Sequence, residues 1–271
     1  MKHFFYILTG LALFSSCEKV VDVDLNEVNP QIVIEANLFE GEHNFLVKVS
    51  QTSSYFETEE TRWLSDATVR LIGPENEVIV LNGLGQGQYS APVLAKGNSL
   101  YTLEVSHDLG VYTASSFLHA RVPVSELSFE EAEIRSPFGQ EQASGDTYYF
   151  AVVRFNDPKE VENFYRFNLA VNGKETNPAR GGYFLTDDIN QDGETTDYRL
   201  RGAFLEAGDT VHVSLLSIDQ AAHAFYETLG DSQGVGPASA SPANPQNNWN
   251  NGALGYFAAI SLDQKSIVIL P

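Results

Sequence analysis

Short runs in which apolar and polar residues alternate place the strongest constraint on the fold of this 271-residue chain. Alternation with a period of two gives a β-strand one apolar face, which must be buried against a second layer. The first seven predicted strands are Ile32–Leu38, Phe45–Ser50, Ala67–Ile72, Val78–Leu81, Gln88–Ala91, Leu100–Ser106 and Val111–Phe117. Their number and spacing predict an immunoglobulin-like β-sandwich over residues 31–122.

A domain boundary is predicted at Arg121-Val122-Pro123, because proline donates no hydrogen bond to a strand ladder. The strands predicted beyond it are Glu126–Ile134, Thr147–Asn156, Phe164–Val171, Arg199–Leu205, Thr210–Ser217, Tyr256–Leu262 and Ser266–Leu270. One helix is expected over Asp219–Leu229, where apolar residues recur at helical spacing and Gly230 supplies a stop. Residues 123–271 are therefore predicted to form a second β-rich domain, and the whole fold to be mainly β.

The N-terminus has the pattern of a secretory signal. Lys2 precedes an apolar run over residues 4–14, which is followed by Ser15, Ser16 and Cys17. This run is shorter than the roughly 20 residues that a membrane-spanning helix needs. Because the chain's single cysteine follows two small residues, we expect a bacterial lipoprotein signal; the alternative is a plain secretory signal with an incidental cysteine.

Cleavage before Cys17 would divide this region into a signal peptide over residues 1–16 and a lipidated tether over residues 17–30. Acyl chains on the Cys17 thiol would then hold the protein on a membrane. The mature chain would have 271 − 16 = 255 residues and, without Lys2, a net charge of −20 − 1 = −21. Anionic headgroups repel so acidic a body, so we expect it to stand off the membrane.

Charge and cysteine content exclude several classes of protein. With 16 Lys+Arg against 36 Asp+Glu, the chain cannot neutralise a run of phosphates, so we expect no nucleic-acid partner. One cysteine excludes a disulfide framework and a thiolate-rich metal site.

An acidic segment, residues 187–194, is the best metal candidate. Asp188, Asn190 and Asp192 put oxygen ligands at alternate positions, Glu194 adds a carboxylate, and the glycine at 193 permits a sharp turn. The bidentate carboxylate expected six positions after that glycine is absent, so calcium would need a ligand from elsewhere or several waters. Two interpretations stay open: a structural calcium site, or a solvated Asx turn between strands. No other cofactor is indicated.

An asparagine-rich segment is the best ligand-binding candidate. Trp249 offers a flat apolar face, and neighbouring amides offer donors and acceptors suited to sugar or peptide contacts. The amides are those of Asn244, Asn247, Asn248 and Asn251. In the alternative interpretation, proline and asparagine shape this loop while Tyr256 and Phe257 close the core.

Sequence signatures of enzymes are lacking. There is no His-Glu-x-x-His, no Gly-x-Ser-x-Gly and no phosphate-binding Gly-Lys-Ser/Thr loop, and the six histidines are scattered. Residues 83–87 hold three glycines, but no helix follows them, so they predict a hairpin turn rather than a nucleotide loop. We therefore expect no enzyme, although a dispersed pair of carboxylates could form a hydrolase site that sequence spacing does not reveal.

Several segments, taken in order, resemble one protein family. They are Cys17–Leu25, Asn156-Asp157-Pro158, Phe164-Tyr165-Arg166, Leu216-Ser217-Ile218-Asp219, Pro242–Pro245 and Asn251–Phe257, which ends in Gly255-Tyr256-Phe257. The chain resembles an uncharacterised family of Bacteroidota lipoproteins with a conserved C-terminal Gly-Tyr-Phe motif. The resemblance implies an outer-membrane lipoprotein that is often encoded beside a TonB-dependent receptor and has no established activity. We expect the protein to face the cell surface, and a periplasmic face is the open alternative.

These observations lead to one favoured function and two alternatives. We expect a lipid-anchored outer-membrane accessory or ligand-capture protein that partners a TonB-dependent transporter and binds through loops at the tips of a rigid β scaffold. The first alternative is a surface adhesion or structural module without a small-molecule cargo. The second is a surface hydrolase with dispersed carboxylates.

Overall fold

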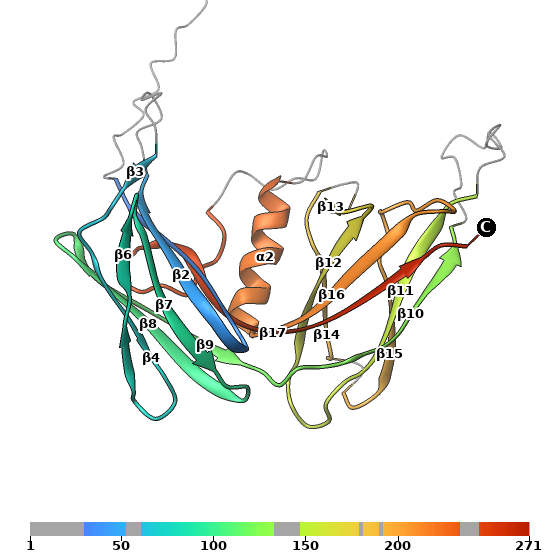
Figure 1. The fold of residues 1–271 in the computed structure, drawn as a ribbon, viewed down its shortest axis with the longest axis horizontal. Coiled ribbons are helices and arrows are strands. Elements are labelled where there is room, and N and C mark those ends of the chain that lie inside the picture. The colour runs from blue at the N-terminus through green and yellow to red at the C-terminus, as the bar shows by residue number, and fades with distance from the viewer. Residues whose placement is uncertain are drawn as a thin grey trace, which may run out of the picture.

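The structure, a computed structural model, describes residues 30–52, 61–132, 147–178, 181–189, 192–233 and 244–270. The predicted signal peptide and Cys17 lie outside these residues. Strands dominate the described chain and a single helix accompanies them, so the mainly-β prediction is confirmed. The described strands pair into three sheets, which form two sandwiches (Figure 1).

The first sandwich packs two sheets around a core that includes Ile34, Val47 and Leu103. Its inner sheet contains β1 (Ile32–Phe39), β2 (Gly41–Gln51), β3 (Arg62–Trp63), β6 (Asn82–Gly85) and β7 (Gln88–Ala95). Its outer sheet contains β4 (Thr68–Ile72), β5 (Val78–Val80), β8 (Ser99–His107) and β9 (Gly110–Leu118). Residues 85–87 all have positive φ between β6 and β7, as the predicted hairpin turn requires.

The second sandwich has a separate core, which includes Phe155, Tyr165 and Phe167. Its inner sheet contains β12 (Phe164–Val171), β13 (Lys174–Thr176), β14 (Phe184–Asp187) and β16 (Thr210–Ile218). Its outer sheet contains β10 (Val124–Glu131), β11 (Tyr149–Asn156) and β15 (Thr195–Arg199). The strand predicted over Arg199–Leu205 is wrong beyond its first residue: the buried side chains of Leu200, Ala203 and Leu205 lie in turns after β15.

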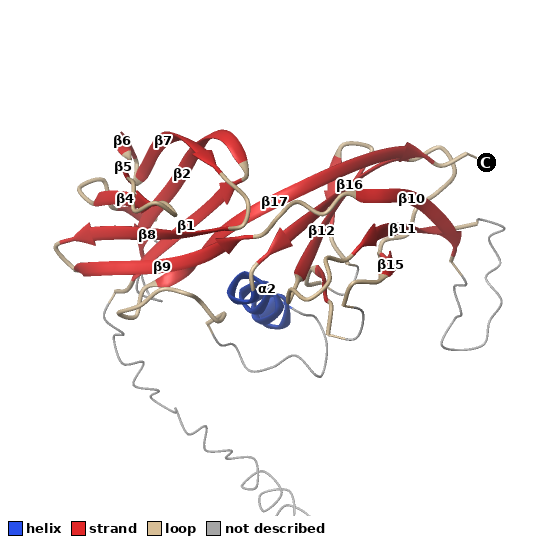
Figure 2. Cartoon of the chain, turned by 90° about the horizontal axis from the view of Figure 1, so that it is seen from below, coloured by secondary structure: helices blue, strands red, loops and turns tan. Residues whose placement is uncertain are grey.

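One long strand, β17 (Leu254–Val268), joins the two inner sheets. Residues 254–260 pair in parallel with β1, and residues 261–268 pair antiparallel with β16. The two strands predicted over residues 256–270 are thus one continuous strand, and the inner sheets form a single ten-stranded sheet (Figure 2). The C-terminal segment also adds Trp249 and Phe257 to the first core, so that sandwich includes residues beyond the predicted range 31–122.

Gly255 permits the parallel pairing of β17 with β1. Its φ is +91°, and an added Cβ would lie 2.2 Å from the carbonyl oxygen of Ile34. Alternation then directs Phe257 into the first core, where it is fully buried, and leaves Tyr256 on the opposite, half-exposed face. In the Gly-Tyr-Phe motif, Gly255 therefore allows the backbone of β1 to approach closely, Tyr256 lies on the open face of the sheet, and Phe257 packs in the core.

The only described helix, α2 (Gln220–Gln233), lies between the two sandwiches, which diverge like the arms of a V (Figure 1). The ten-stranded sheet lines the inside of the V. Asp219 caps the helix, because its carboxylate accepts a hydrogen bond from Ala222 N at 2.8 Å. The predicted stop at Gly230 is wrong: this residue lies inside the helix, where its missing Cβ allows close packing against Gly182.

Candidate functional site

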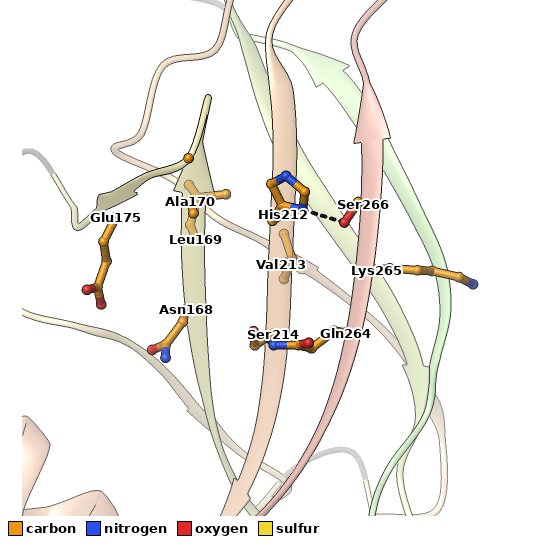
Figure 3. A pocket seen from close by; sticks show the side chains of 11 residues that line it. Asn168, Leu169, Ala170, Glu175, His212, Val213, Ser214, Gln264, Lys265 and Ser266 are labelled. Carbon is orange, nitrogen blue, oxygen red and sulfur yellow. Dashed lines mark hydrogen bonds between the residues drawn. The ribbon is translucent and has the colours of Figure 1, made fainter.

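Polar side chains form cross-strand rows on the inner face of the second arm. His212 lies between Ala170 and Ser266, and Ser214 lies between Asn168 and Gln264, as the strand registers require (Figure 3). His212 Nδ1 is 2.5 Å from Ser266 Oγ, and Gln264 donates to Ser214 Oγ at 2.9 Å. These rows line a cavity of about 490 Å³.

A second cavity, of about 430 Å³, lies beside α2. The motif Phe164-Tyr165-Arg166 explains how the chain builds it: alternation turns Tyr165 into the core and Arg166 toward the inside of the V. Asn168 lines both this cavity and the first one, so the two adjoin. The remaining lining comes from both arms and from the helix, which contributes Tyr226.

Arg166 is held by aromatic rings. Its guanidinium carbon lies 4.0 Å from the ring centroid of Tyr226 and 4.7 Å from that of Tyr183, which are cation–π distances. Its Nε is buried and has no hydrogen-bond partner. Burial raises the pKa of Tyr226 far above its usual range, so this phenol is neutral at all physiological pH values.

Tyr256 connects this cavity with a third one, of about 330 Å³, on the first arm. Its ring stacks on Phe225 with centroids 4.5 Å apart, and its hydroxyl accepts a hydrogen bond from Asn37 Nδ2 at 3.0 Å. The other polar atom of Asn37, Oδ1, is buried without a partner. Asn44 and Lys48 line the far side of the third cavity.

We call the surface formed by these three adjoining cavities the inner trough. Representative lining residues are Asn37, Lys48, Arg166, Asn168, Ser214 and Tyr256. Sequence analysis did not select it, although strand alternation marks each of these side chains as lying on the face opposite the core. What alternation does not reveal is that the open faces of two sandwiches form one concave surface.

The asparagine-rich segment that the sequence favoured for ligand binding is largely engaged in internal contacts. Trp249 is 7% exposed, and its indole donates to the carbonyl of Ile34 at 3.2 Å. Asn248 exchanges hydrogen bonds with the backbone of Phe257, and Asn251 donates to the carbonyl of Val111 at 2.7 Å.

The two remaining residues of that prediction are closer to solvent. Asn247 accepts a hydrogen bond from Trp249 N at 3.1 Å, and Asn244 is exposed. Two of the four predicted amides, Asn248 and Asn251, therefore hold this segment against β17 and β9, which agrees with the alternative interpretation that they shape the loop.

The acidic segment brings two of its predicted metal ligands together. Carboxylate oxygens of Asp188 and Asp192 lie within 4.8 Å of each other and of an oxygen of Asp157. Asp157 and Asp188 are buried, whereas Asp192 is exposed. Asn190 lies outside the described residues, and Glu194 is exposed. If calcium binds, Asp157 lies where it could supply the additional ligand that the sequence prediction requires. In the sequence, only the Asn156-Asp157-Pro158 segment of the family resemblance included this residue.

Backbone amides also serve these carboxylates. Gly193 N donates a hydrogen bond to Asp157 at 3.0 Å, and Asn163 N donates one to Asp188 at 3.0 Å. Glu160 N donates one to Asp192 at 2.7 Å. Burial raises the pKa of Asp157 above its usual value. Oxygens at this spacing fit the 2.3–2.6 Å bonds of a calcium ion, and the amide donors equally fit an Asx-type turn. The calcium site stays a prediction.

Comparisons with known proteins assign no activity. Residues 18–266 match the family described as "Domain of unknown function (DUF4249)". No curated protein matches. Among solved structures, the chain is similar to one titled "Structure of alpha-L-rhamnosidase from Dictyoglumus thermophilum", with 14% identity and a TM-score of 0.23.

That similarity covers 68% of this chain but only 27% of the rhamnosidase chain, and a TM-score so low carries no argument about function. The description of the matched family names neither an activity nor a ligand. Within the described ranges, no helix has the length and hydropathy needed to cross a membrane.

Proposed function

This chain belongs to that family of unknown function, and on this premise we propose that it is a lipid-anchored outer-membrane protein that captures a ligand for a TonB-dependent transporter. The observation that carries the proposal is the inner trough. Amide, hydroxyl, imidazole and guanidinium groups line it beside aromatic rings, and this combination is typical of small-molecule binding sites.

The architecture suits capture followed by release. The trough is built on β-strands of one ten-stranded sheet, so its side chains are held by a rigid scaffold. Its cavities lie open on the inside of the V, which favours moderate affinity and rapid exchange. We therefore place ligand binding on the sheet face rather than on the loop tips that the sequence suggested.

We also propose that the protein is not an enzyme. The contact between His212 and Ser266 is the one place in the trough where a nucleophile meets a base. Both residues lie within regular strands, and the chain around Ser266 contains no turn or helix start that would direct two backbone amides at one oxyanion. Neither residue has a described carboxylate partner to orient the imidazole.

The position of the chain's N-terminal end supports a capture role. The first arm begins with β1, which starts at the end of the sandwich toward which the V opens (Figure 1). An anchor at Cys17 would tether the protein through this end of the first arm and keep the trough close to a transporter in the same membrane. This proximity would shorten the path of a released ligand from the trough to the transporter.

The proposal is tested by a pull-down of the tagged, lipidated protein from its own outer membrane in mild detergent, read by mass spectrometry. We expect a stoichiometric β-barrel receptor. A Cys17→Ser variant, which cannot be lipidated, is the matched control and should recover less receptor. Recovery of the protein alone would contradict the transporter partnership and favour the adhesion or structural module.

A further inference from the structure

Arg166 differs from the other arginines that the structure describes. Four of them pair with carboxylates at 2.6–3.2 Å, namely Arg70, Arg121, Arg154 and Arg199. Arg62 and Arg201 are exposed to solvent. Arg166 is half-buried and has no carboxylate partner within the described residues, in a chain with a net charge of −20. A cation that lines a cavity and forms no ion pair indicates a site for an anion.

The hydrogen bonding of Arg166 is incomplete as well. The two tyrosine rings interact with the face of the guanidinium, but they provide no in-plane acceptor for the buried Nε–H. A buried donor without an acceptor destabilises the unliganded state. A carboxylate matches the planar fork of a guanidinium and would supply both the missing charge and the missing acceptor.

A complementary group lies on the other arm, in the same cavity. Asn37 uses its amide N–H to reach Tyr256, while its Oδ1 is buried and accepts nothing. Glu35 also lines this cavity, so a second negative charge on the ligand would be repelled. The lining of this cavity also includes the aromatic side chains of Phe39 and Tyr256, which suit a flat apolar body.

We infer that the cavity beside α2 binds a small monocarboxylate, with the carboxylate on Arg166, a flat apolar body against the aromatic walls and a hydrogen-bond donor directed to Asn37. This inference gives the proposed capture function a class of cargo, and its biological meaning rests on that function. The larger polar cavity around His212 and Ser214 would accommodate substituents that extend past Asn168.

The test uses 4-hydroxyphenylacetate, which carries all three features, as the probe for the mature, lipidated protein in mild detergent. Binding is followed by ligand-observed NMR, with empty micelles as the baseline. At about 0.3 kcal/mol per heavy atom, its 11 heavy atoms predict a Kd of roughly 1–10 mM. The neutral analogue 4-hydroxyphenylacetamide should bind at least about tenfold more weakly.

Variants assign the interactions to residues. Arg166→Gln should weaken the binding of 4-hydroxyphenylacetate at least about tenfold and leave the binding of the neutral amide nearly unchanged. The reason is that substituting Arg166 and replacing the carboxylate by an amide remove the same interaction. Arg201→Gln removes the same charge from an exposed site and should change neither affinity. Phenylacetate lacks the hydroxyl donor. It should bind the wild type several-fold more weakly than 4-hydroxyphenylacetate does, whereas Asn37→Leu should bind the two acids equally well.

Two results would overturn the inference. One is the absence of saturable binding of 4-hydroxyphenylacetate to the wild type at 20 mM, roughly twice the highest Kd expected for a fragment of this size. The other is that the wild type binds 4-hydroxyphenylacetate and its amide with equal affinity. This second measurement uses only the wild type, so it does not depend on whether Arg166→Gln folds.

Failure of this inference is distinguishable from failure of the proposed function. If the receptor co-purifies but the wild type does not prefer the acid, only the cargo class is wrong. If the acid binds through Arg166 but no receptor co-purifies, the site stands and the transporter partnership falls.

Discussion

Two polar, aromatic regions of this protein use the same kinds of side chain in opposite ways. In the asparagine-rich segment, Asn248 donates a hydrogen bond to the carbonyl of Phe257, and Trp249 donates one to the carbonyl of Ile34. In the inner trough, Arg166 and Asn37 each keep a buried polar atom without a partner. The difference teaches that residue type alone does not mark a binding surface: amides whose hydrogen bonds are made stabilise a fold, and those left incomplete are available to a ligand.

The largest effect expected from this comparison is the loss of stability in Trp249→Ala. The indole is buried in the first core, so its removal should cost about 3–5 kcal/mol. Trp63→Ala is the matched control, since Trp63 is 42% exposed and its loss should cost below about 1 kcal/mol. Urea unfolding of both variants measures the difference. Equal stabilities would show that Trp249 is not the core residue described above.

The second-largest expected effect is stabilisation of the fold by calcium at the acidic segment. If Asp157, Asp188 and Asp192 bind the ion, calcium at 100 times its Kd should stabilise the protein by about 2.7 kcal/mol. Asp188→Asn should abolish that gain, whereas Asp108→Asn, at an exposed carboxylate, should keep it. Thermal unfolding with calcium or with a chelator measures both. No shift in wild type at millimolar calcium would favour the Asx-turn interpretation.

A pair of asparagine variants sharpens the comparison further. Asn248→Ala leaves the buried backbone groups of Phe257 without partners and should cost about 1–3 kcal/mol. Asn168→Ala, in the trough, should change stability by less than about 0.5 kcal/mol. Chemical denaturation of the two variants gives the difference directly. A more damaging Asn168→Ala would make the trough residue structural and reverse the comparison.

The smallest effect is a pH dependence at the base of α2. Burial lowers the pKa of His223 below 6.5, and its ring lies 5.2 Å from that of Phe164. The folded state thus binds fewer protons than the unfolded state, so stability present above pH 6.5 is lost as the pH falls through the folded-state pKa. His223→Phe should flatten this part of the stability curve. Desolvation also lowers the pKa of the half-buried His119, so a His119 variant has to be measured in parallel.

Local features of the fold could be predicted from sequence, whereas long-range ones could not. Alternation located β1, β8, β12 and β16, and helical spacing located α2, because both patterns depend on near neighbours. The parallel pairing of Gly255 with Ile34 joins residues more than 200 positions apart and leaves no periodic signal. Short strands such as β13 and β15 lie at sheet edges, where few apolar residues mark them.

The candidate site residues also divide into those that sequence could identify and those that only the fold brings together. The sequence identified Asp188 and Asp192 because they are neighbours in one segment, and it did not assign Asp157, which reaches them from another strand end. It identified the asparagine-rich segment from composition, but only the structure shows where its hydrogen bonds go. Arg166 belonged to a segment noted for resemblance alone, and its environment depends on Tyr226, which is 60 positions away on α2.

The most direct test of the central claim is to ask whether the inner trough binds a ligand from the protein's own surroundings. Wild type, Arg166→Gln and the exposed control Arg201→Gln would each be equilibrated with small molecules extracted from the culture of the producing cells. Ligand-observed NMR, which detects rapidly exchanging ligands, would compare their binding. We predict a carboxylate-bearing compound that binds the wild type and Arg201→Gln equally and binds Arg166→Gln at least about tenfold more weakly. Equal binding of the same compounds to all three proteins would contradict the account.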